Sequence, residues 1–158
     1  MFFKIRTAKK EDCGLILTFI KELASYEKLE DQVTGTKKDI EETLFGISPK
    51  AEVLILEVDA VPSGFALFFH NYSTFLCRPG IYIEDIYVRP HYRGKGYGQA
   101  LLRHICAIAE ERQCGRVEWW CLDWNKPSVD FYKKLGAEAM EDWTVYRLNR
   151  EKIKELAE

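Results

Sequence analysis

The sequence Arg93-Gly94-Lys95-Gly96-Tyr97-Gly98 follows an apolar stretch at residues 81–88 and precedes a stretch with helical apolar spacing, residues 100–109. Glycine lets backbone N–H groups approach an anion closely, and it adopts positive φ easily. A helix start adds unpaired N–H donors and a partial positive charge. Arg93 and Lys95 add formal charge, so the segment predicts a phosphate-binding loop. The alternative is a glycine-rich turn that only lets a strand meet a helix.

Two common nucleotide-binding loops do not fit this segment. A P-loop needs Ser or Thr after its Gly-Lys pair, but Gly96 follows Gly94-Lys95 here. A dinucleotide-binding loop has the spacing G-x-G-x-x-G after the first strand, whereas these glycines run G-x-G-x-G after a late strand. The expected phosphate therefore belongs to another kind of ligand.

Hydrophobic periodicity predicts strands and helices on both sides of the loop. Their order is typical of a mixed α/β domain, one sheet with helices packed on it. The chain of 158 residues has no linker, so we expect a single domain over residues 1–158. The expected strands cover residues 2–7, 53–58, 64–72, 81–88, 117–122 and 143–148, and the expected helices cover 11–26, 37–45, 99–114, 128–135 and 150–157.

Composition narrows the classes of partner. A formal net charge of −2 is unlike that of most nucleic-acid-binding domains, which are usually basic on one face. No apolar run is long enough to cross a bilayer, and Lys4 and Arg6 interrupt the N-terminal apolar residues. We expect a cytoplasmic protein with no nucleic-acid or membrane partner. The five cysteines lack metal-ligand spacing, so no metal site is expected.

Arg93-x-x-Gly96-x-Gly98, placed after Ile86-Tyr87-Val88, resembles the R/Q-x-x-G-x-G/A motif of the GNAT acetyltransferases. From about residue 5 to 150 the chain is similar to their spermidine/spermine and thialysine group. This resemblance implies the GNAT fold: an α/β structure with a single mixed, mostly antiparallel twisted sheet and helices on both faces. It also implies acetyl-CoA as co-substrate and a homodimer. The matching segments include residues 20–33, 83–88, 92–94, 122–125 and 131–137.

The resemblance also implies which residues hold acetyl-CoA. Backbone N–H groups of the strand would bind the acetyl and pantetheine part, and those of the loop would bind the pyrophosphate. Asn125 could equally cap a helix, and the two uses are compatible. The implied cofactor-binding residues are Ile86, Tyr87, Val88, Arg93, Gly94, Lys95, Gly96, Tyr97, Gly98, Gln99, Asn125, Lys126, Pro127 and Ser128.

Acetylation of an amine sets chemical requirements. A primary amine has a pKa near 10.4, so the site needs a proton acceptor, and the leaving thiolate needs a proton donor. The resemblance assigns Glu84 to the amine side, as a base acting through water or as an anchor, with an ordinary ion pair as the alternative. Tyr132 matches the family's general acid, and an aromatic pair with Phe131 is the alternative. Glu84 and Asp85 are adjacent, so on a regular strand they point to opposite faces.

The amine itself is predicted from the same resemblance. Thr74 and Thr144 stand where the polyamine enzymes carry acids, so we expect a thialysine-like or lysine-like amino acid or a short diamine. A protein or peptide N-acetyltransferase and a non-catalytic acyl-CoA-binding regulatory module remain alternatives. Of two adjacent tryptophans, one is expected in the core and the other could line the amine channel, but core packing is the favoured interpretation for both. The candidate substrate-binding residues are Tyr26, Glu27, Glu84, Asp85, Glu118, Trp119 and Trp120.

Overall fold

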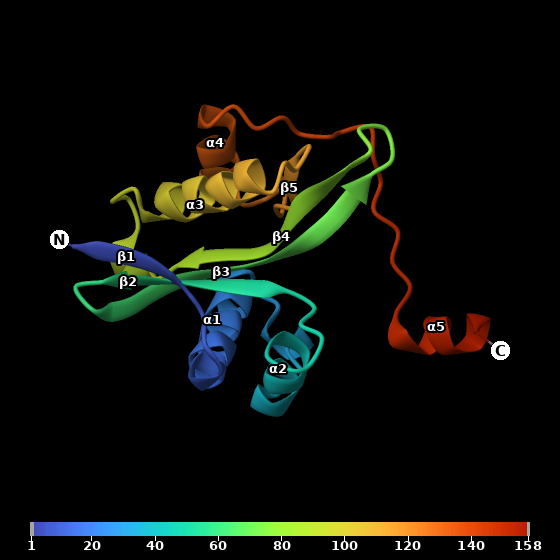
Figure 1. Ribbon diagram of the computed structural model, residues 1–158, viewed down its shortest axis with the longest axis horizontal. Coiled ribbons are helices and arrows are strands. Elements are labelled where there is room, and N and C mark those ends of the chain that lie inside the picture. Colours follow the sequence, from blue (N-terminus) through green and yellow to red (C-terminus); the bar gives the residue numbers. More distant parts are fainter. Residues whose placement is uncertain (1, 158) are drawn as a thin grey trace. The chain divides into compact units, whose positions relative to one another are not determined.

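The structure, a computed structural model, describes residues 2–157, and within them lies a five-stranded sheet of order β1-β2-β3-β4-β5 (Figure 1). The first four strands pair antiparallel, and β4 pairs with β5 in parallel. The expected mixed, mostly antiparallel sheet is therefore confirmed. The strands are β1 (Phe3–Thr7), β2 (Glu52–Val58), β3 (Val61–Ser73), β4 (Arg78–Val88) and β5 (Val117–Trp119).

The chain forms two compact units, one ending at Trp120 and the other beginning at Cys121. The first unit contains the whole sheet and three α-helices, α1 (Cys13–Tyr26), α2 (Lys37–Leu44) and α3 (Tyr97–Glu111). The second contains α4 (Lys126–Lys134) and α5 (Arg150–Leu156). The single domain over residues 1–158 stays a prediction.

Helices of the first unit cover both faces of the sheet (Figure 1). Leu101 and Ile105 of α3 pack with Leu56 of β2 on one face. On the other face, Ile16 and Phe19 of α1 pack with neighbours from β2 and β3. The apolar run over residues 53–56 is fully buried, as expected of a strand that is covered on both sides. The predicted helices on both faces are therefore confirmed.

Local sequence explains where α2 begins. Thr36 is its N-cap, and the Thr36 hydroxyl accepts a hydrogen bond from the Asp39 N–H at 3.2 Å. The Asp39 carboxylate in turn accepts a hydrogen bond from the Thr36 N–H at 2.7 Å. This reciprocal pair satisfies two backbone N–H groups that would otherwise lack partners, and the helix begins at Lys37.

A β-bulge interrupts β4 near the predicted site. Asp85 lies opposite Leu67 and Ile83 lies opposite Phe68, which leaves Glu84 as the extra residue. Before the bulge, Ile83 belongs to the core under α3, whereas beyond it Tyr87 belongs to the core under α1. Because side chains alternate along a strand, Asp85 shares the α1 face with Tyr87.

The prediction of a strand over residues 143–148 is wrong, because the structure has no strand in that segment. A strand needs a neighbour for its backbone N–H and C=O groups, and the described part of the second unit contains no other strand. Trp143 is 77% exposed and Tyr146 is 92% exposed. The strand expected at 117–122 was also too long, since β5 ends at Trp119.

Candidate functional site

The glycine loop has the backbone conformation that its sequence predicts. Gly94 and Gly96 have φ of 74° and 85°, in the left-handed region that favours glycine. Gly96 is the N-cap of α3, whose first helical hydrogen bond runs from the Ala100 N–H to the Gly96 carbonyl at 3.0 Å. A Cβ added at Gly94 or Gly96 would meet no atom within 4 Å. The loop therefore faces open space beside a helix N-terminus, which fits a diphosphate.

The two cationic side chains of the loop, Arg93 and Lys95, make different contacts. The Arg93 Nε donates a hydrogen bond to the Val88 carbonyl at 2.7 Å. Its guanidinium carbon lies 4.5 Å from the ring centroid of Tyr26 and 5.5 Å from that of Tyr87. The Lys95 ammonium is exposed and lies 5.9 Å from the centroid of its neighbour, the Tyr92 ring. Arg93 thus contacts the end of α1.

Three carboxyl groups gather at the end of α1 and the bulge of β4. Burial, the largest cause, and the negative charges of Glu84 and Glu27 together raise the pKa of Asp85 to about 7. Burial also raises the pKa of Glu27, the residue that follows α1. Glu84 itself is exposed on the bulge. Among the described residues, no Lys or Arg forms a salt bridge with any of these three side chains.

An ion pair absent from the sequence-based prediction fixes α1 against the end of β4. The Arg89 Nη2 lies 2.8 Å from the Glu22 Oε1, and the Arg89 Nη1 donates to the Pro62 carbonyl at 2.9 Å. The Arg89 guanidinium also lies 4.8 Å from the Phe19 ring centroid. Glu22 and Arg89 lie 67 residues apart, so no local pattern could have paired them.

Residues 19–137 match the Acetyltransferase (GNAT) family. The chain belongs to this family. It is 40% identical to the thialysine N-epsilon-acetyltransferase of Bos taurus, a match that covers 99% of this chain and 98% of that one. It is 31% identical to the L-ornithine N5-acetyltransferase of Arabidopsis thaliana, over 94% of this chain and 85% of the relative. The family and the first relative identify an acetyltransferase of the thialysine group.

A solved structure shares the same fold. An integron cassette protein from the mobile metagenome of V. cholerae superposes with a TM-score of 0.82. The superposition covers 99% of this chain and 98% of that one, at 24% sequence identity. The GNAT fold expected from the sequence is therefore confirmed.

Of the candidate residues at the edge of this GNAT sheet, Glu118 and Trp119 lie in β5, and Trp120 follows directly after it. Trp119 packs against the core under α3, as expected of one tryptophan. Trp120 is 57% exposed, and its ring meets that of Tyr82 edge-on at 5.7 Å between centroids. Glu118 forms an ion pair with Arg116 at 2.8 Å and accepts a hydrogen bond from the Asn71 amide at 3.1 Å. A role for Glu118 or Trp120 in binding the amine stays a prediction.

The remaining candidate residues of the GNAT site lie in the second unit. Asn125 occupies the N-cap position of α4, but its side chain forms no capping hydrogen bond. Lys126, Pro127 and Ser128 form the first turn of this helix, where backbone N–H groups lack helical acceptors. Tyr132 lies one helical position after Phe131, with ring centroids 5.3 Å apart. Its role as general acid stays a prediction.

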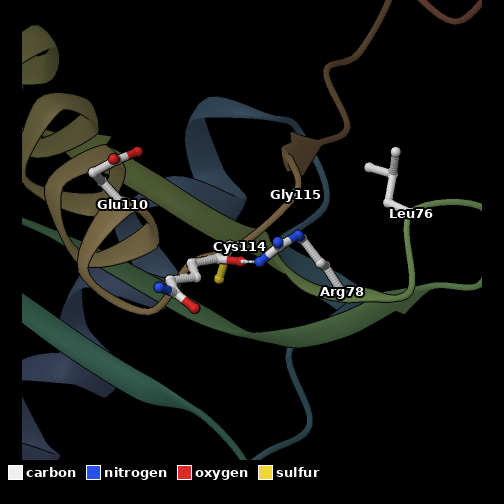
Figure 2. A pocket seen from close by; sticks show the side chains of 6 residues that line it. Leu76, Arg78, Glu110, Cys114 and Gly115 are labelled. Carbon is white, nitrogen blue, oxygen red and sulfur yellow. Dashed lines mark hydrogen bonds between the residues drawn. The ribbon is translucent and has the colours of Figure 1, made fainter.

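A surface depression of about 430 Å³ lies in the first unit (Figure 2). It is at the C-terminal end of α3, whereas the glycine loop is at the N-terminal end. Figure 2 shows the hydrogen bond from the Arg78 Nη1 to the Gln113 carbonyl, at 3.5 Å. No candidate site residue lines it, so it does not belong to the predicted GNAT site. Its lining residues are Leu76, Arg78, Glu110, Gln113, Cys114 and Gly115.

No group of three or more His, Cys, Asp or Glu side chains within residues 2–157 could hold a metal ion. In the same part of the chain, no helix is long and apolar enough to cross a membrane. The candidate site consists of backbone amides, carboxyl groups and aromatic rings.

Proposed function

We propose that this acetyltransferase moves the acetyl group of acetyl-CoA to a primary amine of a small molecule, preferably a thialysine-like or lysine-like amino acid or a short diamine. The observation that carries this proposal is the group of three carboxyl side chains beside the glycine loop. Asp85 and Glu27 are partly buried and have raised pKa values, so a cationic amine that entered would relieve their repulsion. The relatives support the substrate class, since both are named for acetylating nitrogen atoms of small amino acids.

We propose Asp85 as the proton acceptor, because it is largely buried and its pKa is raised. A carboxyl group with a pKa of about 7 is partly ionised at neutral pH, and it matches the requirement for a general base. Glu84, which the family resemblance favours, sits exposed on the bulge next to it. We therefore assign Glu84 and Glu27 to attracting and anchoring the ammonium group. Matched variants of Asp85 and Glu84 separate the two assignments.

Acetyl-CoA supplies the activated acetyl thioester when it is bound. The amides around Gly94 and Gly96 would hold its diphosphate, and the last residues of β4, Ile86 to Val88, would orient its pantetheine arm. The first turn of α4 would add further contacts. Tyr132 would donate a proton to the leaving sulfur, because its phenolic O–H can act as a donor.

The mechanism proposed is direct attack of the amine within a ternary complex. Its kinetic signature is a set of intersecting double-reciprocal lines when both substrates are varied. Parallel lines, or an acetylated protein detected by intact mass spectrometry after incubation with acetyl-CoA alone, would support a covalent intermediate instead.

The test of function is a thiol-release assay with acetyl-CoA and a panel of amines. We expect thialysine, lysine, ornithine and short diamines to be acetylated with higher kcat/KM than spermine or peptides. A preference for peptides would establish the protein N-acetyltransferase alternative. Binding of acetyl-CoA by calorimetry without thiol release from any amine would establish the non-catalytic module.

We further propose a cytoplasmic location and a homodimeric assembly, which the family resemblance supports. Trp143 and Tyr146 expose large aromatic rings that an interface could cover. Light scattering after gel filtration would then give twice the chain mass of 18.5 kDa. A mass of one chain at micromolar concentration would contradict the dimer. Fractionation of cells with an antibody against the chain tests its location.

A further inference from the structure

We propose that Arg93 is a positioning residue for the amine side of the site, and that its guanidinium holds the C-terminal end of α1 instead of binding the phosphate. This inference rests on the proposed function, because it concerns the residues that would receive the amine. It reassigns the charged residue of the R-x-x-G-x-G sequence from the cofactor to the other substrate.

The contacts of Arg93 carry the inference. Its guanidinium lies against two aromatic rings from different elements, Tyr26 at the end of α1 and Tyr87 near the end of β4. Its Nε donates to the Val88 carbonyl at 2.7 Å, which fixes the plane of the group. A planar guanidinium suits such a position, because it stacks on aromatic faces while its N–H groups form hydrogen bonds in fixed directions.

The same contacts argue against a phosphate role for Arg93. To reach a diphosphate at Gly94 and Gly96, the guanidinium would have to leave both rings and break the Val88 hydrogen bond. Lys95 is held less firmly, since its ammonium lies 5.9 Å from the Tyr92 ring, near the limit of a cation–π contact. Lys95 is therefore the loop cation that is placed to meet the phosphate.

The contact between Arg93 and Tyr26 also affects the position of Glu27. Tyr26 is the last residue of α1, and Glu27 follows it directly. The chain turns there, with the Glu27 N–H bonded to the Leu23 carbonyl at 2.9 Å and the Leu29 N–H bonded to the Ala24 carbonyl at 2.8 Å. Holding the Tyr26 ring therefore also fixes where the Glu27 carboxyl lies relative to Asp85.

The first experiment compares Arg93→Met with Lys95→Met. We expect Arg93→Met to raise the amine KM about fivefold, the upper range of an exposed cation–π contact, with kcat and acetyl-CoA affinity within about twofold of the original. Lys95→Met should do the reverse, weakening acetyl-CoA binding by calorimetry while leaving the amine KM unchanged. Arg93→Lys should not restore the amine KM, because an ammonium cannot stack and donate in the same plane.

A double-mutant cycle identifies the partner of Arg93. Tyr26→Leu removes the ring, and Tyr26→Phe keeps it. If Arg93 acts through Tyr26, the variant carrying both Arg93→Met and Tyr26→Leu should have an amine KM no higher than the worse single variant. Tyr26→Phe combined with Arg93→Met should show the full Arg93 effect. Additive effects of Arg93→Met and Tyr26→Leu would contradict this partnership.

Hydrogen exchange provides a readout that does not depend on activity. In Arg93→Met, the amides of residues 27–29 should exchange about fivefold faster, in the range of the lost contact, while those of Lys95→Met should not change. The inference is overturned if Arg93→Met leaves this exchange and the amine KM unchanged but lowers acetyl-CoA affinity. If no amine is acetylated at all, the proposed function fails, and the exchange measurement still decides whether Arg93 holds α1.

Discussion

Asp85 lies close enough to Glu27 for the negative charge of the Glu27 carboxylate to raise the pKa of Asp85. Burial is the larger cause, and together with Glu84 these effects bring the pKa of Asp85 to about 7. A cation between two partly buried carboxyl groups relieves their mutual repulsion and favours their ionised forms. The proximity of Asp85 and Glu27 therefore favours binding of a positively charged amine between them.

The pH dependence of activity tests the role of Asp85. If its ionised form accepts the proton, kcat/KM should rise with pH on an acidic limb whose apparent pKa is near 7. Asp85→Asn should abolish that limb and lower kcat/KM by about 10²- to 10⁴-fold, the usual contribution of a general base. Glu84→Gln is the matched control and should retain the limb. Loss of the limb in Glu84→Gln alone would instead make Glu84 the base.

Stability should depend on the same carboxyl group. The pKa of Asp85 is raised from its ordinary 3.8 to about 7 in the folded chain, so between these pH values the folded state binds more protons than the unfolded state. The Asp85 contribution to the free energy of unfolding therefore falls as pH rises from about 4 to about 7. Asp85→Asn should be more stable than the original protein at pH 8, by up to about 4 kcal/mol.

The control for that stability measurement is pH itself. Near pH 4, Asp85 is protonated in the folded chain and half protonated when unfolded, so the advantage of Asp85→Asn should almost disappear. Urea unfolding at pH 4, 6 and 8 measures the difference. An advantage that stayed constant across this range would rule out the raised pKa of Asp85 as its cause.

We expect position 96 to require glycine because of its backbone conformation. Gly96 has φ of 85°, where an L-residue is strained, so Gly96→Ala should lower the free energy of unfolding by about 1–2 kcal/mol and weaken acetyl-CoA binding. Gly14→Ala is the matched control, in helix α1 with no atom within 4 Å of the added Cβ. It should stabilise the protein by up to about 1 kcal/mol. Undiminished acetyl-CoA affinity in a folded Gly96→Ala protein would argue against the phosphate cradle.

Tyr132→Phe removes one hydroxyl group from α4 and keeps the ring that pairs with Phe131. If the hydroxyl protonates the leaving sulfur, kcat should fall about 10²-fold or more while calorimetry shows little change in acetyl-CoA binding. The aromatic-pair interpretation predicts the opposite, full activity in Tyr132→Phe. An unchanged kcat would therefore remove Tyr132 from the mechanism.

Much of the fold could be predicted from the sequence because it depends on local patterns. The alternation and helical spacing of apolar residues identified strands β1 to β4 and helices α1 to α5 within a few residues of their bounds. The segment over residues 143–148 has a strand-like composition, but strand formation also requires a neighbouring strand, which lies outside the local sequence. That prediction was wrong for this reason.

The glycine loop could be predicted from local sequence, because the positive φ angles of Gly94 and Gly96 and the helix that follows depend on adjacent residues. Only the tertiary structure decided which way the charged side chains lie. The bulge at Glu84 places Asp85 on the α1 face of the sheet. The Arg93 guanidinium lies against the ring of Tyr26, which precedes it by 67 residues in the chain. Strand register and contacts between distant segments set those directions, and neither is encoded in the neighbouring residues.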